Sequence, residues 1–390
     1  MSFDFDTQLA LKGTHSSKYD AIAREFGRDD PEMIPMWVAD MDFPAPPPVL
    51  KAVQDEIDRG FMGYFTNLKP VAEAVSSWYA DRHGWTVDPD CVRFTHGVVN
   101  AYGVALATFT DPGDEVIVFS PVYHAFFRQI EAMGRVVVES PLLIQDSVFH
   151  MDLAELEASL SGREKVLTLC TPHNPGGRIW SEDELREVAS FCRKHDLILI
   201  SDEIHMDLVF PGARFIPTCT AAPDCVDRLI VLTAASKGFN LAGGETGVMV
   251  VPDDALRQRI DVVLVDREAT PNRFGMLMMK AAFTEGAEWS DAVRTYLAEN
   301  FRLFAERIGN LPGVSVMPMN ATYLSWVDFT SLGMSDAELI DRMLDANVAP
   351  EKGTKFRHGG SGHLRFNVAL PRPTLITAIE RIEKAFADLQ

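Results

Sequence analysis

The middle of the chain alternates short apolar runs with helical patterns, and this alternation restricts the possible folds more than any other feature. The apolar runs lie at residues 115–119, 165–169, 197–201, 229–233 and 246–251. They are rich in Val, Ile and Leu and lack polar alternation, which is typical of strands that are covered on both faces. We therefore predict an α/β fold in which helices cover both faces of a largely parallel sheet.

One connection in this region shows how the layers are joined. Ser181 and Glu184 form a capping-box pattern, and an apolar stripe at Leu185, Val188 and Phe191 follows. This pattern predicts a helix between two of the strands. Such strand–helix–strand units bring loops to the carboxyl ends of parallel strands, where ligands bind in open α/β sheets.

The length of 390 residues exceeds the ~250–300 residues at which one hydrophobic core stops growing, so we expect two packed domains. Residues 46–285 are predicted to form the large domain. Residues 286–390 show long helical patterns and then hairpin-like strands at 321–327 and 363–368, and they are predicted to form a smaller α+β domain. Residues 1–45 are expected to pack on that domain or on a neighbouring subunit.

The net charge bears on possible partners. It is −20, and an acidic surface repels phosphate backbones and anionic lipids, so neither nucleic acid nor a membrane is expected as a partner. No apolar run approaches the ~20 residues that span a bilayer. Residues 1–12 lack a secretion-signal pattern, so we expect a cytoplasmic protein. The five scattered cysteines are expected to be reduced thiols, neither disulfides nor metal ligands.

Two polar features follow predicted strands. The run Thr95-His96-Gly97-Val98-Val99 opens a helix that is expected to reach about Phe109. Backbone N–H groups at a glycine-led helix N-terminus bind anions such as phosphate, although most such patterns are plain caps. Asn174 lies in an Asn-Pro-Gly-Gly sequence directly after the strand 165–169. This sequence is by default only a turn, but a rigidly held Asn can hydrogen-bond a ligand above the sheet.

Two charged residues follow the next strands. Asp202 ends an apolar strand, where a carboxylate must be paired or functional because burial of a lone charge is costly; the alternative is a helix N-cap. Lys237, preceded by Ser236, lies just past another strand. Desolvation there lowers the pKa of a lysine and makes its amine a nucleophile, although most lysines simply lie on the surface.

Taken together, these features resemble the fold-type I pyridoxal 5′-phosphate (PLP) enzymes, which have the aspartate-aminotransferase fold. Within that group the chain is similar to the cystathionine β-lyase-type C–S lyases of the MalY/PatB branch, and the resemblance covers essentially the whole chain. The matching segments are IPMWVADMDF at 34–43, GY at 63–64, PVY at 121–123, HNPGG at 173–177, SDEIH at 201–205, SK at 236–237, PN at 271–272, GAEW at 286–289, ATYL at 321–324 and LRFN at 364–367.

The resemblance implies a role for most of these residues. Lys237 holds the cofactor as a Schiff base and moves protons, Asp202 pairs with the pyridine nitrogen, Asn174 binds the ring hydroxyl and lies near the substrate, and Tyr123 stacks on the ring. The residues that line or hold the cofactor and its phosphate are Gly97, Val98, Val99, Ser236 and His205.

The substrate side of the implied site uses two further residues. Arg365 binds the carboxylate of an amino-acid substrate, since a planar guanidinium matches a carboxylate; the alternative is a surface arginine on a strand. Tyr64 reaches the cofactor phosphate and substrate of the neighbouring subunit, so a homodimer with shared active sites is implied.

Two departures from the family pattern bear on the reaction. Glu245 stands where aminotransferases of this fold usually carry a phosphate-binding Arg, and this favours a lyase. His124 follows Tyr123, where the lyase branch often has an aromatic residue, so the substrate pocket is expected to differ. We predict β-elimination from cystathionine or a related S-substituted L-cysteine. Aminotransfer between an amino acid and a 2-keto acid uses the same residues and stays open, as does a PLP-binding regulator.

Overall fold

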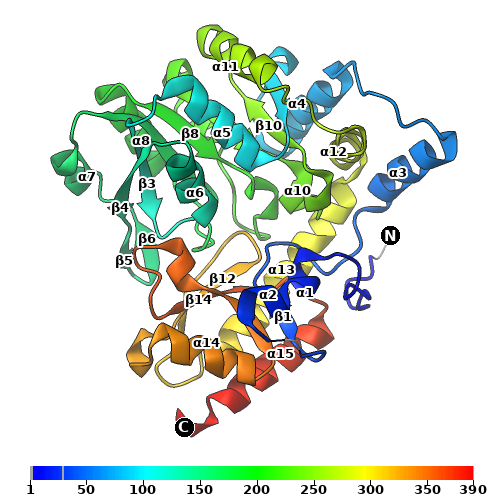
Figure 1. Ribbon diagram of the computed structural model, residues 1–390, viewed down its shortest axis with the longest axis vertical. Coiled ribbons are helices and arrows are strands. Elements are labelled where there is room, and N and C mark those ends of the chain that lie inside the picture. Colours follow the sequence, from blue (N-terminus) through cyan, green and yellow to red (C-terminus); the bar gives the residue numbers. More distant parts are fainter. Residues whose placement is uncertain (1–2, 29, 390) are drawn as a thin grey trace.

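The computed structural model describes residues 3–28 and 30–389. Its largest sheet (Figure 1) has the strand order β2, β10, β9, β8, β7, β3, β4. These strands are β2 (Val92–Thr95), β10 (Gly247–Val250), β9 (Leu229–Thr233), β8 (Ile198–Asp202), β7 (Glu164–Cys170), β3 (Glu115–Ser120) and β4 (Val136–Pro141). β10 is antiparallel to both of its neighbours, and the other neighbouring pairs are parallel. The predicted α/β fold with a largely parallel sheet is confirmed.

Helices of very different length surround the two sheets. They are α1 (Ser17–Asp20), α2 (Ile22–Phe26), α3 (Pro47–Arg59), α4 (Lys69–His83), α5 (Val98–Phe109), α6 (His124–Ala132), α7 (Leu153–Ser159), α8 (Glu182–Lys194), α9 (Thr218–Ala221), α10 (Ala235–Gly238), α11 (Asp254–Asp266), α12 (Arg273–Glu285), α13 (Ala287–Ile308), α14 (Asp336–Asp345) and α15 (Arg372–Ala385). The predicted helix after Gly97 is α5, and it ends at Phe109 as expected.

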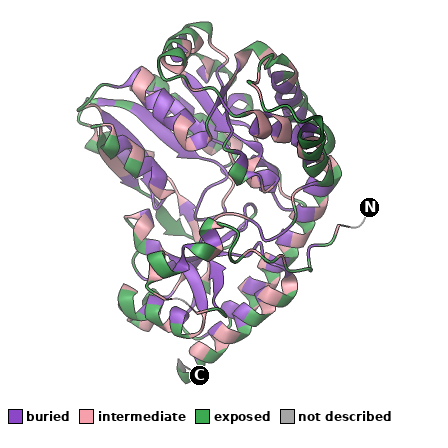
Figure 2. Cartoon of the chain, turned by 45° about the vertical axis from the view of Figure 1, so that its right-hand side comes forward, coloured by how far each residue is buried: buried purple, intermediate pink, exposed green. Residues whose placement is uncertain are grey.

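The large sheet is buried on both faces, which explains the absence of polar alternation in its strands. Val116 and Val118 of β3 lie in a core with residues of α5, α6 and α11, whereas Ile117 and Phe119 lie in a second core with residues of α8. Figure 2 shows these strands as buried along most of their length. The capping box that was predicted at the start of α8 is present, since Ser181 and Glu184 each bind the other's backbone N–H through a side-chain oxygen.

The second sheet has the strand order β1, β13, β14, β12, β11. Its strands are β1 (Ile34–Met36), β13 (Val348–Lys352), β14 (His363–Asn367), β12 (Leu324–Asp328) and β11 (Ser315–Val316), and a separate hairpin joins β5 (Leu143–Gln145) to β6 (Val148–His150). β12 and β14 are antiparallel neighbours, but they do not form the expected hairpin, because α14 and β13 intervene in the chain. β1 joins this sheet from the N-terminal part of the chain by pairing with β13.

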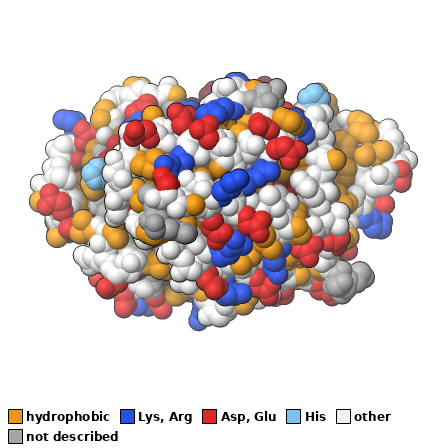
Figure 3. All heavy atoms as spheres, turned by 90° about the horizontal axis from the view of Figure 1, so that it is seen from below, with side chains coloured by type: hydrophobic (Ala, Val, Ile, Leu, Met, Phe, Trp, Pro, Cys, Tyr) orange, Lys and Arg blue, Asp and Glu red, His pale blue; other side chains and the backbone are white. Residues whose placement is uncertain are grey.

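The surface mixes both signs of charge. On the face that Figure 3 shows, acidic and basic side chains are interspersed. Among the described residues, no helix is long and apolar enough to cross a membrane. The same part of the chain has no group of three or more His, Cys, Asp and Glu side chains that could hold a metal ion.

Candidate functional site

The predicted site residues gather at one edge of the large sheet. β2 is parallel to β9, because β10 is antiparallel to both, so the carboxyl ends of β2, β3, β7, β8 and β9 meet at the same edge. Gly97, Tyr123, Asn174, Asp202 and Lys237 each lie at one of these ends or a few residues beyond it. Parallel strands therefore bring together residues that are far apart in the sequence.

Lys237 lies in α10, a short helix that follows β9. Its Nζ donates a hydrogen bond to the carbonyl oxygen of Ala39 at 2.6 Å. Burial lowers the pKa of Lys237 to about 8, the carboxylates of Asp40 and Asp202 raise it, and the charge of Arg365 lowers it. A lysine with such a pKa holds a neutral, nucleophilic amine in a substantial fraction of molecules near neutral pH.

Asp202 is the last residue of β8, and its side chain is buried. Its Oδ1 accepts a hydrogen bond from the backbone N–H of Ile204 at 3.1 Å. Burial raises the pKa of Asp202 to about 7, and the charge of Lys237 lowers it. The carboxyl group is therefore suited to a cationic partner that enters the site, because such a partner would stabilise its ionised form.

Arg365 connects the second sheet to the edge of the first. It lies in β14 and is 2% exposed, and its guanidinium donates to Asn174 Oδ1 at 3.0 Å and to the carbonyl oxygen of Trp37 at 2.8 Å. Its Nε is buried without a hydrogen-bond partner. Burial lowers the pKa of Arg365, and Glu351 raises it. A buried guanidinium with a free N–H fits a small carboxylate.

The start of α5 offers backbone donors. Gly97 is its N-cap, with φ 86° and ψ 167°, a conformation that is essentially restricted to glycine. No side chain caps this end of the helix, so the N–H groups of Val98 and Val99 can bind an anion. Ser236 lies at the start of α10 beside the end of β9, on the same sheet edge.

Three rings lie around this edge. Tyr123 is the N-cap of α6, and burial raises its pKa. His205 is buried, its Nδ1 has no hydrogen-bond partner, and burial lowers its pKa to about 3, so the imidazole is neutral at physiological pH. The ring centroids of His124 and Tyr123 lie 4.9 Å apart, and burial lowers the pKa of His124 to about 4.

Tyr64 is not brought together with the other residues. Its side chain is fully exposed, and its carbonyl oxygen accepts a hydrogen bond from Arg273 at 3.2 Å. The expectation that Tyr64 serves a neighbouring subunit stays a prediction. Glu245 is exposed as well, at the end of the short helix after α10.

The segment that precedes α3 contributes to the site in a way that was not predicted. Its MWVADMDF run matches the family pattern, but no role was expected for the Ala39 carbonyl or for Asp40, which both affect Lys237. A signal was present, because two carboxylates in an otherwise apolar run must find partners when the run is buried. The buried side chain of Lys18 is one of those partners.

The chain is similar to known proteins over almost its whole length. The family model for aminotransferase class I and II matches residues 31–382. Cystathionine beta-lyase PatB of Bacillus subtilis (strain 168) is 37% identical over 98% of this chain and 100% of its own length. Protein MalY of Escherichia coli (strain K12) is 30% identical over 99% of this chain and 98% of its own length. The crystal structure of cystalysin from Treponema denticola, which contains a PLP cofactor, has a TM-score of 0.95, 32% identity and 100% coverage of both chains.

Proposed function

This chain belongs to the class I and II aminotransferase family, and within that family we propose that it is a PLP-dependent C–S β-lyase. It cleaves cystathionine or a related S-substituted L-cysteine to a thiol, pyruvate and ammonia. The observation that supports this most is the pair formed by the half-buried Lys237 and the buried Asp202 at neighbouring strand ends, with Arg365 beside them. The name of the relative PatB, a cystathionine beta-lyase, favours elimination over aminotransfer.

The residues of the site fit PLP. The uncapped N-terminus of α5, with the N–H groups of Val98 and Val99, suits the phosphate, and Ser236 adds a hydroxyl. Asp202 offers a buried carboxylate whose raised pKa falls when a pyridinium nitrogen pairs with it. Asn174 would bind the ring hydroxyl, Tyr123 would stack on the ring, and His205 would lie in contact with the cofactor. When bound, PLP supplies an electron sink for the electron pair that is left when a bond to the substrate Cα breaks.

Each catalytic residue has a task that follows from its environment. Lys237 would hold the cofactor through its amine, and the same amine would take the proton from the substrate Cα. Its pKa of about 8 suits a base that works near neutral pH. Arg365 binds the substrate α-carboxylate through its free N–H, and its bond to Asn174 fixes the orientation of both side chains.

The proposal also covers the domain limits, the homodimer and the location of the protein in the cell. We place the large cofactor-binding domain at residues 46–285 and the small domain at 286–390, with residues 1–45 packed on the small domain. Two chains form a homodimer in which Tyr64 of each reaches the phosphate and substrate of the other. A cytoplasmic location is supported by the five cysteines, which are all free thiols.

The test is the release of pyruvate and ammonia from L-cystathionine, L-cystine and S-methyl-L-cysteine by the PLP-loaded protein. Equimolar release of both products without an added keto acid is expected. Turnover that requires a keto acid would make the protein an aminotransferase that uses the same residues.

A substitution tests the identity of the reacting amine. Lys237→Ala is expected to abolish both turnover and the covalent PLP adduct that borohydride fixes in the wild type, as measured by mass spectrometry. The exposed Lys280→Ala is a matched control that should keep the adduct. An adduct that persists in Lys237→Ala would contradict the assignment.

A further inference from the structure

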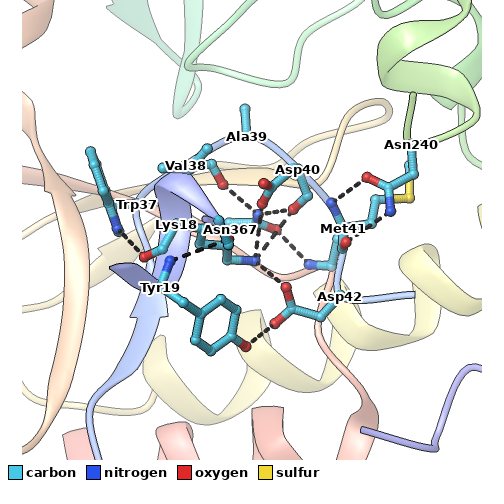
Figure 4. Close-up of polar contacts among 12 residues, drawn as sticks. Lys18, Tyr19, Trp37, Val38, Ala39, Asp40, Met41, Asp42, Asn240 and Asn367 are labelled. Carbon is cyan, nitrogen blue, oxygen red and sulfur yellow. Dashed lines mark hydrogen bonds and ion pairs between the residues drawn. The ribbon is translucent and has the colours of Figure 1, made fainter. Parts of the chain in front are cut away.

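The segment of residues 37–43 crosses the site and is held on several sides (Figure 4). Asn367 of β14 donates to the carbonyl oxygens of Val38 at 2.7 Å and Asp40 at 2.5 Å. From the other side, Asn240 accepts a hydrogen bond from the N–H of Met41 at 2.9 Å and donates to its carbonyl oxygen at 2.8 Å. The backbone of the segment is therefore fixed by a side chain of β14 in the second sheet and by one that follows α10 at the edge of the large sheet.

A buried lysine lies against the two carboxylates of this segment. Lys18 of α1 has no exposed surface, and its Nζ lies 3.0 Å from Asp42 Oδ1 and 3.6 Å from Asp40 Oδ1. Asp42 also accepts a hydrogen bond from the hydroxyl of Tyr19 at 2.6 Å. Asp42 is thus bound through both oxygens. By contrast, the Oδ1 of Asp40 is buried and accepts no hydrogen bond.

The amine of Lys237 lies on the other side of the same segment. The carbonyl oxygen of Ala39, which accepts the hydrogen bond from Lys237, also accepts one from the hydroxyl of Tyr323 at 3.0 Å. Asp40 is the next residue. Burial raises the pKa of Asp40, and the charges of Lys18 and Lys237 lower it, while the charge of Asp40 raises the pKa of Lys237. Asp40 acts on the pKa of Lys237 more strongly than Asp202 does.

The charged and titratable groups around Lys237 come from several segments of the chain. They are Asp40 of the 37–43 segment, Asp202 of β8, His205 just after β8 and Arg365 of β14, and the hydroxyl of Tyr323, just before β12, shares the Ala39 carbonyl oxygen with Lys237. Asp202 is assigned to the cofactor in the proposed function, His205 is neutral at physiological pH, and Arg365 repels the lysine ammonium. Among the described residues around Lys237, Asp40 is the remaining charged group that can stabilise that ammonium, beside the carbonyl oxygen of Ala39.

We propose that Asp40 is a positioning residue for the catalytic lysine: its carboxylate, oriented by Lys18, draws the released Lys237 amine to the Ala39 carbonyl and stabilises it as an ammonium between proton transfers. This inference rests on the proposed function, because it concerns the amine that PLP would engage. Asp42 carries the same charge in the same segment, but its carboxylate is directed to Lys18 and Tyr19. Its role is therefore to hold the segment.

The experiment compares Asp40→Asn with the matched control Asp42→Asn. The first measurement follows, as a function of pH, the rate at which the full-length protein, stripped of its cofactor, captures added PLP as a Schiff base. The second is the pH profile of kcat for the loaded enzyme. The wild-type rate is expected to rise with pH as the amine of Lys237 loses its proton.

Removing a negative charge destabilises the ammonium, so the midpoint in Asp40→Asn should move to lower pH, by about one unit. Asp40→Ser, a smaller neutral side chain, should give the same shift, and Asp40→Glu should return the midpoint toward that of the wild type. Asp42→Asn should lower the thermal stability and leave the midpoint where it is in the wild type. Circular dichroism checks that each variant is folded.

Two results would overturn the inference. One is a wild-type midpoint in both Asp40→Asn and Asp40→Ser, and the other is an equal shift in Asp42→Asn. A failure of the proposed function is distinguishable, because Lys237→Ala would then capture PLP with the same rate and pH profile as the wild type.

Discussion

At the scale of single residues, the protonation of Asp202 couples the site to stability. Burial raises its pKa from 3.8 to about 7, so between these values the folded protein holds a proton that the unfolded chain releases. This contribution to stability is complete below about pH 4 and is lost as the pH rises through about 7. An amide in Asp202→Asn does not titrate, so the stability of this variant does not fall with pH through this group. The cofactor-free variant should gain stability relative to the wild type, by up to about 1.4 kcal/mol per pH unit between about pH 4 and pH 7.

Urea unfolding from about pH 5 to about pH 8 measures this difference, with the exposed Asp183→Asn as the control. Adding PLP should reverse the ranking, because a pyridinium nitrogen pairs with a carboxylate and not with an amide. A difference between Asp202→Asn and the wild type that does not depend on pH would contradict the argument.

The same scale shows which residues can be predicted from the sequence. Lys237 and Asp202 were found because each follows an apolar strand, and the ends of parallel strands meet at one edge. The Ala39 carbonyl was not found, since a backbone acceptor has no signature in the sequence and lies 198 residues from its donor. The role of Asp40 depends on that same long-range contact.

At the scale of elements, the start of α5 depends on the backbone of Gly97. Its φ of 86° and ψ of 167° cost a non-glycine residue on the order of 1–3 kcal/mol. Gly97→Ala should therefore lower the free energy of unfolding. If the start of α5 shifts to relieve about 1.4 kcal/mol of this strain, its N–H donors move, and PLP should bind roughly tenfold more weakly. PLP titration monitored by absorbance, together with urea unfolding, measures both effects.

Gly84→Ala at the end of α4 is the control for this change. Gly84 has φ 68° and open space around it, so its replacement should cost stability without a loss of PLP affinity. If both variants lose the same PLP affinity, α5 does not hold the phosphate.

Five strands of the large sheet, β3, β7, β8, β9 and β10, were predicted to within one residue at each end, because uninterrupted apolar runs mark strands buried on both faces. The edge strands β2 and β4 were not predicted. The second sheet was harder to predict. Its strands pair out of sequence order, with β1 and β13 from opposite ends of the chain. Periodicity within a segment carries no information on such pairing.

At the scale of the whole molecule, an apolar surface marks the proposed dimer contact. Exposed large apolar side chains cluster on α3 and the loop that follows it: Leu50, Ile57, Phe61, Met62, Tyr64 and Leu68. The others are Val262 and Val265 on α11, Val136 on β4, and Leu143 and Ile144 on β5. Neighbouring exposed apolar side chains such as those of α3 and the loop after it are expected to be buried against a partner. Sedimentation should therefore give about twice the chain mass of 43.3 kDa.

Mixing two defective variants tests whether the sites are shared. In a hybrid of Lys237→Ala with Tyr64→Ala, shared sites leave one site with both native residues, supplied by different chains, and the other site with neither. Co-refolded mixtures should then regain up to about a quarter of the wild-type activity, because about half of the dimers are hybrids with one intact site. If each site uses its own Tyr64, no site in the hybrid is intact and the mixture stays at the mean of the two variants. A monomer in sedimentation would exclude shared sites altogether.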